Sequence, residues 1–207
     1  MKAQNIKCII LGHRNYGEFN KIVFLYSQEY GKLKVVAKGA RKITSKFTGH
    51  LETLNFCSAS IYFGPRSTIL TEIETIQSNK HLRTDLTKLK AALQIAEITD
   101  QLLFENQNIT NLLELLKQTL DQLIISQKES IIIYSYIIKL LDHTGHIPDF
   151  SDFKEDKYLK FFHYLKINPV ADAEKISLSK EENYIINNKL KKAIETQTDR
   201  EIKSFTI

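Results

Sequence analysis

The first feature with chemical meaning is a run of basic side chains between Tyr30 and Glu52, where no acidic residue occurs. A row of cations can neutralise successive phosphates of a nucleic acid and release the counterions bound to them. The pattern therefore predicts a phosphate-binding surface, with Arg14 as an additional contact. The predicted contacts within the run are Lys32, Lys34, Lys38, Arg41, Lys42 and Lys46.

Aromatic residues accompany these cations, and exposed rings can stack on unpaired bases. They are Tyr16, Phe19, Tyr26, Tyr30 and Phe47. Two plainer interpretations compete, because small barrels fill their interior with aromatic side chains and lysine runs often form a solvated face. Nucleic-acid binding is favoured because the cations gather on one strand and the loop that follows it.

Residues suited to metal binding or nucleophilic catalysis are sparse. His143 and His146 are the nearest approach to a ligand pair, but they straddle a predicted helix end and lack the His-Glu-x-x-His arrangement of a metalloprotease. Cys8 and Cys57 lie in apolar segments, which is typical of small buried thiols in a reducing cytosol. We expect no metal site and no disulfide.

The sequence also contains no motif typical of nucleotide binding or of acid–base catalysis. No Gly-x-x-x-x-Gly-Lys-Ser/Thr or Gly-x-Gly-x-x-Gly sequence occurs, so ATP binding is not predicted. The carboxylates Glu97, Asp100 and Glu105 are spaced as on a solvated helix face and form no isolated pair. The sequence therefore predicts a protein that is not an enzyme and needs no cofactor.

The net charge of +5 is concentrated in the first part of the chain. Residues 1–80 contain 12 Lys and Arg against 5 Asp and Glu, whereas the remaining residues contain 17 against 19. No apolar run approaches the roughly 18–20 residues of a membrane span, and the first residues lack the pattern of an export signal. We expect a cytoplasmic protein.

Five runs rich in β-branched and aromatic residues occur before residue 80, separated by turns that contain glycine. They cover residues 5–11, 21–27, 32–38, 54–63 and 68–76. In the third run Leu33, Val35 and Ala37 point to one side, and the lysines point to the other. These runs predict a compact β-barrel whose third strand has a cationic outer face.

Apolar residues at three- and four-residue spacings predict an all-α domain after residue 80. Asp85 and Thr110 are candidate caps of its first and second helices, and Ser179 with Glu182 has the spacing of a capping box for its last helix. The expected helices cover residues 86–103, 109–123, 129–143, 157–165 and 179–195. The predicted fold class is α+β, with domains 1–80 and 81–207.

The turn and strand motifs of the first fifty residues resemble the RecO family of DNA repair proteins. The matching segments are Tyr16-Gly17-Glu18, Lys21-Ile22-Val23, Tyr30-Gly31-Lys32, Ala37-Lys38-Gly39-Ala40-Arg41-Lys42, Ser45-Lys46 and Gly49-His50-Leu51. Weaker agreement continues in Leu82-Arg83-x-Asp85-Leu86, Gly145-His146-Ile147-Pro148 and Arg200-Glu201-Ile202-Lys203-Ser204. The specific part of the likeness lies in the first fifty residues.

The resemblance implies a five-stranded OB-fold barrel that binds DNA, joined to a helical domain. It implies a non-catalytic recombination mediator of the RecF pathway that binds single- and double-stranded DNA and anneals complementary strands. The implied partners are RecR, RecA and the acidic tail of single-strand-binding protein. Together with RecR, such a protein loads RecA onto DNA coated by single-strand-binding protein, without ATP hydrolysis, and it is associated with the nucleoid.

The chain departs from the family pattern in its cysteines. In the family the Gly-x-x-Pro element is usually followed by a four-cysteine zinc module, whereas no cysteine follows Cys57 here. We therefore expect the zinc module to be absent from the 147–178 region. A structural zinc stabilises a loop-rich module with little core, and an aromatic cluster is the hypothetical replacement: Tyr158, Phe161, Phe162, Tyr164 and Leu165.

Two other functional classes stay open at this point. In the first, the protein is an interaction adaptor that binds acidic protein tails, and DNA binding is incidental. In the second, it is a nuclease or another phosphoryl-transfer enzyme, which the absence of a carboxylate cluster suited to magnesium disfavours. Salt-dependent binding of an oligonucleotide separates the DNA-binding protein from the adaptor.

Overall fold

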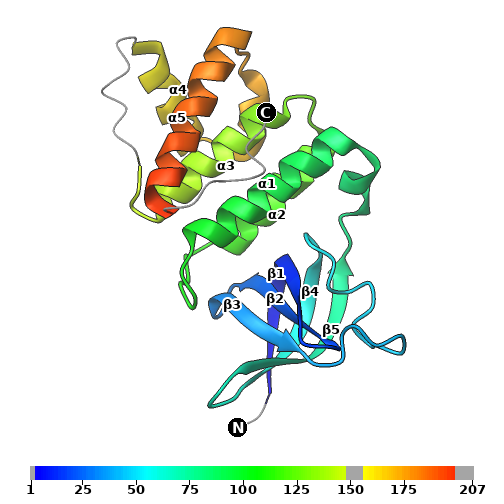
Figure 1. The fold of residues 1–207 in the computed structure, drawn as a ribbon. Coiled ribbons are helices and arrows are strands. Elements are labelled where there is room, and N and C mark those ends of the chain that lie inside the picture. The colour runs from blue at the N-terminus through cyan, green and yellow to red at the C-terminus, as the bar shows by residue number, and fades with distance from the viewer. Residues whose placement is uncertain (1–2, 148–155, 199–207) are drawn as a thin grey trace. The chain divides into compact units, whose positions relative to one another are not determined.

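A computed structural model of the chain describes residues 3–147 and 156–198, and Figure 1 shows its fold. Pro148 and the terminal motif Arg200–Ser204 lie outside the described residues. The chain forms two compact units. The first unit contains Met1–Lys80 and Leu103–Leu113, and the second contains His81–Leu102 and Glu114–Ile207.

The first unit is a closed five-stranded barrel, as predicted, with the strand order β1-β2-β3-β5-β4. Its only parallel pair among the described strands joins β3 to β5, and the other pairs are antiparallel. This is the OB-fold that the resemblance implied. The strands are β1 (Gln4–Tyr16), β2 (Asn20–Ser27), β3 (Gly31–Ala37), β4 (Phe56–Phe63) and β5 (Thr68–Gln77).

Strand β1 closes the barrel because it pairs with two partners. Its first half, from Gln4 to Ile9, pairs with β4, and its second half, from Cys8 to Tyr16, pairs with β2. The register with β2 shifts between Ile10 and Gly12. A bulge of this kind bends a strand and increases its twist, which lets one long strand serve both neighbours.

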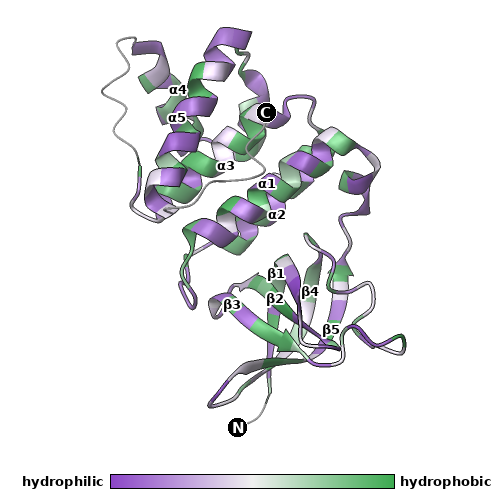
Figure 2. Ribbon diagram, viewed as in Figure 1, coloured by the Kyte–Doolittle hydropathy of each residue, from purple (hydrophilic) through white to green (hydrophobic). Residues whose placement is uncertain are grey.

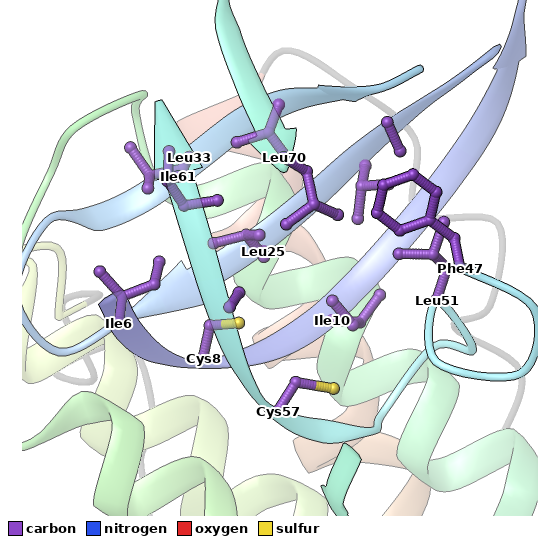
Figure 3. Packing of buried hydrophobic residues seen from close by; sticks show 14 residues of the cluster. Ile6, Cys8, Ile10, Leu25, Leu33, Phe47, Leu51, Cys57, Ile61 and Leu70 are labelled. Atoms are coloured by element: carbon purple, nitrogen blue, oxygen red, sulfur yellow. The ribbon is translucent and has the colours of Figure 1, made fainter. Parts of the chain in front are cut away.

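The barrel interior is filled by the alternate side chains of the strands (Figure 3). Leu33, Val35 and Ala37 of β3 are all buried there, so the predicted alternation of this strand is confirmed. Phe47 and Leu51 belong to the long β3–β4 loop and also enter the core. These two side chains anchor the loop to the barrel.

Cys8 of β1 and Cys57 of β4 are paired in register and point into the same core (Figure 3). Both thiols are buried and free, as the sequence predicted. Burial raises the pKa of the Cys57 thiol to about 11 and holds the pKa of Cys8 well above its ordinary value. Both side chains therefore act as small apolar residues at neutral pH.

Residues 103–109 cover the outer side of β3 and belong to the same unit. The amide of Lys32 donates to the carbonyl of Gln107 at 3.3 Å, and the amide of Asn106 donates to the carbonyl of Lys32 at 2.7 Å. Gly31, with φ +66°, lies so close to the backbone of Gln107 that no side chain would fit there. The segment thus adds a short extra pairing to the edge of β3.

Tyr26 of β2 completes this attachment. Its hydroxyl donates to the carbonyl of Ile109 at 2.9 Å and accepts from the amide of Ile109 at 2.8 Å. The Asn108 side chain donates to the carbonyl of Gln28 at 2.9 Å. Tyr26 is fully buried, although the alternation of β2 directs it away from the barrel interior.

The second unit is helical, and its central helix α3 begins and ends as predicted. Helix α3 packs against α1, α4 and α5, and ten of its residues are buried, which is why it forms the middle of the unit. The turn η2, which follows Pro169, was not predicted from the sequence. The elements are η1 (Lys80–Thr84), α1 (Leu86–Leu102), α2 (Leu112–Ile125), α3 (Glu129–His143), α4 (Asp156–Ile167), η2 (Val170–Lys175) and α5 (Lys180–Thr198).

The predicted caps at Asp85 and Ser179 are present, whereas α2 begins at Leu112, two residues after the third predicted cap, Thr110. The Asp85 carboxylate accepts from the amides of Thr87 and Lys88 at 2.8 and 3.2 Å at the start of α1. At the start of α5, the Ser179 amide donates to the Glu182 carboxylate at 2.9 Å, and the Glu182 amide donates to the Ser179 hydroxyl at 3.2 Å. This is a reciprocal capping box. Figure 2 shows polar and apolar residues alternating along α5, as expected of a helix with one buried face.

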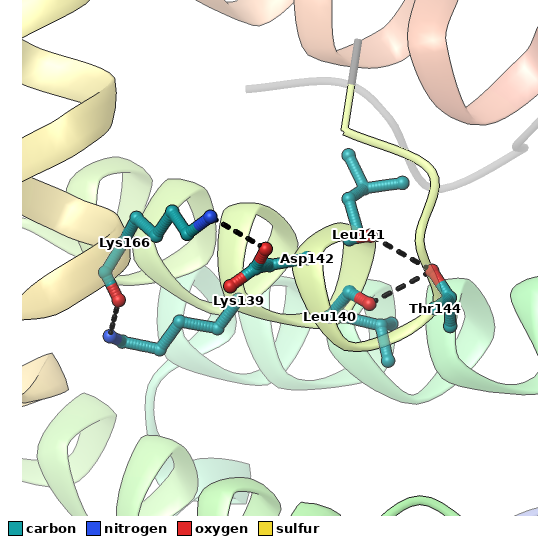
Figure 4. A network of polar contacts seen from close by, with 6 residues as sticks. All are labelled: Lys139, Leu140, Leu141, Asp142, Thr144 and Lys166. Carbon is teal, nitrogen blue, oxygen red and sulfur yellow. Dashed lines mark hydrogen bonds and ion pairs between the residues drawn. The ribbon is translucent and has the colours of Figure 1, made fainter.

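Polar contacts join α3 to the end of α4 (Figure 4). The Lys139 ammonium donates to the carbonyl of Lys166 at 2.8 Å, and the Lys166 ammonium pairs with the Asp142 carboxylate at 2.8 Å. Burial lowers the pKa of Lys139, and Asp142 partly offsets this effect. The Thr144 hydroxyl donates to the carbonyl of Leu140 at 3.0 Å, and the same carbonyl also accepts from the Thr144 amide at 3.0 Å at the end of α3.

Helix α4 lies in the 147–178 region and buries part of the aromatic cluster noted in the sequence. Tyr158, Phe162 and Leu165 are buried, and the rings of Phe161 and Phe162 meet edge to face with centroids 5.4 Å apart. The replacement of a zinc module by this packing stays a hypothesis. Within the part of the chain that the structure describes, no helix has the length and apolar character to cross a membrane.

Candidate nucleic-acid interface

The β1–β2 turn and the β3–β4 loop are fastened together at one end of the barrel. The Arg41 guanidinium donates to the carbonyls of Gly17 and Glu18 at 3.2 and 3.0 Å, and the Arg41 amide donates to the carbonyl of Phe19 at 2.9 Å. The Asn20 carboxamide oxygen accepts from the amide of Gly39 at 2.9 Å. The two connections therefore present a common surface.

Strand register places three of the predicted cations on one outer face. Arg14 of β1 is opposite Ile22 of β2, which is opposite Val36 of β3. Lys34 lies two residues from Val36 in one direction and Lys38 lies two residues away in the other, so all point to the same side of the sheet. Arg14, Lys34 and Lys38 are exposed.

The β3–β4 loop supplies Arg41, Lys42 and Lys46, and both of these lysines lie near an aromatic ring. The Lys42 ammonium is 5.6 Å from the centroid of the Phe19 ring, and the Lys46 ammonium is 5.8 Å from that of Phe47. The Arg14 guanidinium carbon is 5.7 Å from the centroid of Phe24 on β2. Because Arg41, Lys42 and Lys46 are exposed, phosphates can approach them directly.

Lys32 does not belong to this surface, contrary to the sequence prediction. Only 9% of Lys32 is exposed, and its ammonium donates to the carbonyl of Leu103 at 3.0 Å. The alternation directs Lys32 outward as expected, but residues 103–109 cover that part of β3. Its charge serves the attachment of this segment and is not available to a phosphate.

Lys34 is partly neutralised by the same segment. Its ammonium lies 3.9 Å from the carboxylate of Glu105, and both side chains are well exposed. An exposed pair at this distance contributes little to stability and is readily exchanged for another anion. Lys34 thus remains able to contact a phosphate at the border of the surface.

The aromatic residues divide into surface and core. Tyr16 and Phe19 are 52% and 45% exposed, and they flank the β1–β2 turn among the cations. Tyr26 and Phe47 are buried, as the competing interpretation predicted. Tyr30 is exposed at 36%, and its ring lies 4.8 Å from that of Phe63.

We call the surface formed by the β1–β2 turn, the β3–β4 loop and the adjoining outer face the basic end of the barrel. Its exposed basic and aromatic residues are Arg14, Tyr16, Phe19, Lys34, Lys38, Arg41, Lys42 and Lys46, and Glu18 of the turn is an exposed acidic residue among them. It combines cations for phosphates with rings for bases, which is the combination found in single-strand binding surfaces.

Among the residues that the structure describes, no group of three or more His, Cys, Asp or Glu side chains could hold a metal ion. The family's zinc module also does not fit the sequence, since Cys8 and Cys57 lie in the barrel core and no cysteine follows them. The four thiolates that such a module needs are not available.

The sequence reasoning missed two contributors to this end of the barrel. Asn20 organises the surface through Gly39, and Glu105 borders it beside Lys34. The segment that carries Glu105 lies about seventy residues after β3 in the chain. An asparagine in a turn is a recognisable local signal, but no sequence pattern near Lys34 predicts its contact with Glu105.

Comparison with known proteins agrees with this architecture. The family described as Recombination protein O N terminal matches residues 1–79, and the one described as Recombination protein O C terminal matches residues 83–152. The chain belongs to the RecO family. The first RecO match coincides with the barrel strands, and the second covers helices α1 to α3.

Three proteins named DNA repair protein RecO illustrate the similarity. The protein of Thermoanaerobacter sp. (strain X514) is 32% identical over 153 residues, which cover 73% of this chain and 62% of the relative. The protein of Bacillus cytotoxicus is 31% identical over 72% of this chain and 60% of the relative. The protein of Shouchella clausii is 34% identical over 68% of this chain and 55% of the relative. The matches thus span about 55–62% of the length of these RecO relatives.

Proposed function

We propose that the protein is a non-catalytic DNA-binding recombination mediator that acts in DNA repair. In this proposal the basic end of the barrel binds the sugar-phosphate backbone of single- and double-stranded DNA. The observation that carries the proposal is the gathering of exposed cations and exposed rings on two connections that are hydrogen-bonded to each other. Membership of the RecO family supports the assignment to DNA repair.

The proposed contacts are the sequence-predicted set without Lys32. Lys38, Lys42 and Lys46 approach phosphates as point charges, and Arg14 and Lys34 extend the site over the outer face of the sheet. Arg41 has a double role, because its hydrogen bonds to Gly17 and Glu18 hold the two connections together. Contacts to phosphate give affinity without base specificity, as a mediator that acts on any sequence requires.

The finer activities follow from family membership and belong to the same proposal. The protein anneals complementary strands, cooperates with RecR and helps to load RecA onto DNA coated by single-strand-binding protein, at the nucleoid. Backbone neutralisation favours annealing because it reduces the repulsion between two strands. The proposal requires no ATP and no bound cofactor.

Charge removal tests the site. A variant with Lys38, Lys42 and Lys46 replaced by glutamine should bind a single-stranded oligonucleotide more weakly. The slope of log affinity against log salt should fall by about 2, because each lost phosphate contact removes about 0.7. A charge-matched control replaces Lys90 and Lys192, together with Lys180, all exposed in the helical unit. Equal affinities and slopes for the two variants would remove the basic end from the proposal.

Annealing tests the mediator activity itself. Complementary strands are coated with the cognate single-strand-binding protein and mixed with the full chain in the absence of ATP. The proposal predicts faster duplex formation with the native chain than with the triple glutamine variant. Binding of uncoated DNA without any acceleration of annealing on coated DNA would rule out the mediator and leave a plain DNA-binding protein.

One observation keeps the adaptor function as a second candidate. A hollow of about 330 Å³ opens beside α4 and α5, and Tyr158, Phe161, Tyr164, Lys157, Lys160 and Glu182 are among its lining residues. Lys157 and Lys160 pair with the carboxylates of Glu182 and Asp156, and such exposed pairs are readily exchanged for the carboxylates of an acidic peptide. The test measures binding of a peptide with the sequence of the acidic tail of single-strand-binding protein. If the triple glutamine variant still binds this peptide and Phe161→Ser does not, tail binding belongs to this hollow.

A further inference from the structure

Ile43 is the most exposed apolar side chain of the described residues, with a relative exposure of 103%. Single exposed isoleucines are ordinary on protein surfaces, and Ile76 on β5 is an example at 52%. Ile43 differs in its setting. It stands in the β3–β4 loop, which belongs to the basic end of the barrel, and it lies between the exposed Lys42 and Lys46 in the sequence.

The loop around Ile43 is ordered by its own hydrogen bonds. The Lys42 amide donates to the carbonyl of Gly39 at 3.1 Å, and the Ser45 amide donates to the carbonyl of Lys42 at 3.0 Å. The Ser45 hydroxyl accepts from the amide of Phe47 at 3.2 Å. Consecutive turns therefore hold Ile43 in a defined outward position.

Ile43 has no part in the barrel core. Phe47 and Leu51 anchor the loop in the interior, and Arg41 ties it to the β1–β2 turn. An apolar residue that is held outward, with its neighbours already anchored, gains nothing from the folded chain. Its surroundings are cations, which repel cationic partners and attract anionic ones.

We propose that Ile43 is a wedge that inserts between two neighbouring bases of a DNA single strand. The inference rests on the proposed DNA binding and goes further, since it assigns base contact to one residue that makes no ionic interaction. Lys42 and Lys46 hold the phosphates on both sides of the inserted side chain. The separated bases then face apolar surface, and the exposed Phe19 ring offers one of them a stacking partner.

A DNA single strand is the partner that can cover Ile43. Isoleucine is one of the apolar side chains that proteins insert between base steps, and each insertion requires the bases to unstack. Unstacking is easiest in a single strand, where no pairing has to be broken. Lys42 and Lys46 lie on either side of Ile43 in the sequence. This order of cation, apolar side chain and cation corresponds to the order of phosphate, base and phosphate along a DNA strand.

The test uses Ile43→Ser in the full chain and an oligothymidine that carries two adjacent 2-aminopurines. The fluorescence of 2-aminopurine is quenched by stacking, so insertion should raise it when the native chain binds. Ile43→Ser should lose this rise and bind about tenfold more weakly, the scale expected for burial of one such side chain. Ile76→Ser is the matched control, and thermal unfolding should be unchanged in both variants.

An oligonucleotide with abasic sites in place of the two 2-aminopurines completes the experiment. Native protein and Ile43→Ser should bind this strand with equal affinity, because no base is left to contact. Equal binding of both proteins to the base-containing strand overturns the wedge, and so does an equal loss on both strands. If the native chain binds no DNA at all, the proposed function fails instead, and the two failures are distinguishable.

Discussion

Replacement of Gly31 by alanine tests the attachment of residues 103–109 to the barrel. Gly31 has φ +66°, a conformation that alanine adopts only with strain. A Cβ atom there would lie 2.6 Å from the amide nitrogen of Asn108 and still closer to the carbonyl group of Gln107. The contact is with backbone, so no side chain can rotate away, and the segment has to move as a whole.

The expected loss has two parts. The backbone strain costs about 1 kcal/mol in the free energy of unfolding. Displacement of the segment also breaks the two backbone hydrogen bonds of Lys32 and the bond from its ammonium to Leu103. At about 1 kcal/mol for each of these three bonds, the total destabilisation, with the strain included, is about 4 kcal/mol.

Gly49→Ala provides the control, because Gly49 has φ +79° and nothing within 4 Å of its would-be Cβ. It carries the strain without the displacement, so it should lose only about 1 kcal/mol. Urea unfolding followed by circular dichroism measures both variants, since the chain contains no tryptophan. Hydrogen exchange of the Asn106 amide adds a local readout. If Gly31→Ala loses no more stability than Gly49→Ala, or keeps the Asn106 amide protected, the inferred attachment is wrong.

Three further predictions concern the core and the helices. Cys8 and Cys57 should resist iodoacetamide at pH 8 in the folded chain and react once it is unfolded in urea. The pKa of each thiol is raised in the folded chain, so above pH 9 the unfolded chain releases thiol protons that the folded chain keeps. The free energy of unfolding should therefore fall as the pH rises from 9 towards 11. This fall should be less steep in Cys57→Ala, which has one buried thiol fewer. Asp85→Ala should destabilise the helical unit by about 1 kcal/mol through loss of the α1 cap, whereas Asp85→Asn should not. Lys139→Met should cost about 1 kcal/mol, since it frees the carbonyl of Lys166; unchanged thermal unfolding would contradict it.

Local patterns predicted most of the elements. Helix α3 has the expected limits because its apolar run and the following Gly145 are both local signals. The caps at Asp85 and Ser179 also depend on residues within one turn of the helix start. Strand β1 is longer than expected, because its second half is a polar, exposed part of the hairpin with β2 and lacks the apolar pattern of its first half.

The sequence predicted that the candidate site would combine basic and aromatic residues, but it predicted only some of the residues that form it. Alternation correctly directs Lys32 outward, but its cover comes from a segment far along the chain, and no local rule detects that contact. The same reason explains Tyr26, whose buried hydroxyl bonds to Ile109. The leucine series predicted Leu103 and residues 109–111 as helix, whereas residues 103–111 lie between α1 and α2 and belong to the barrel unit, because tertiary pairing outweighs helical spacing there.

The discontinuous make-up of the barrel unit has a consequence during synthesis. The strands are complete once β5 has been made, but the covering segment follows only after helix α1. At 5–20 residues per second, the ribosome needs about two to seven seconds to extend the chain from residue 80 to residue 113. Mixed and β-rich domains of this size fold in milliseconds to seconds, so the strands have time to pair first. A nascent chain paused in this interval carries a barrel with Tyr26 and the outer side of β3 open to other chains.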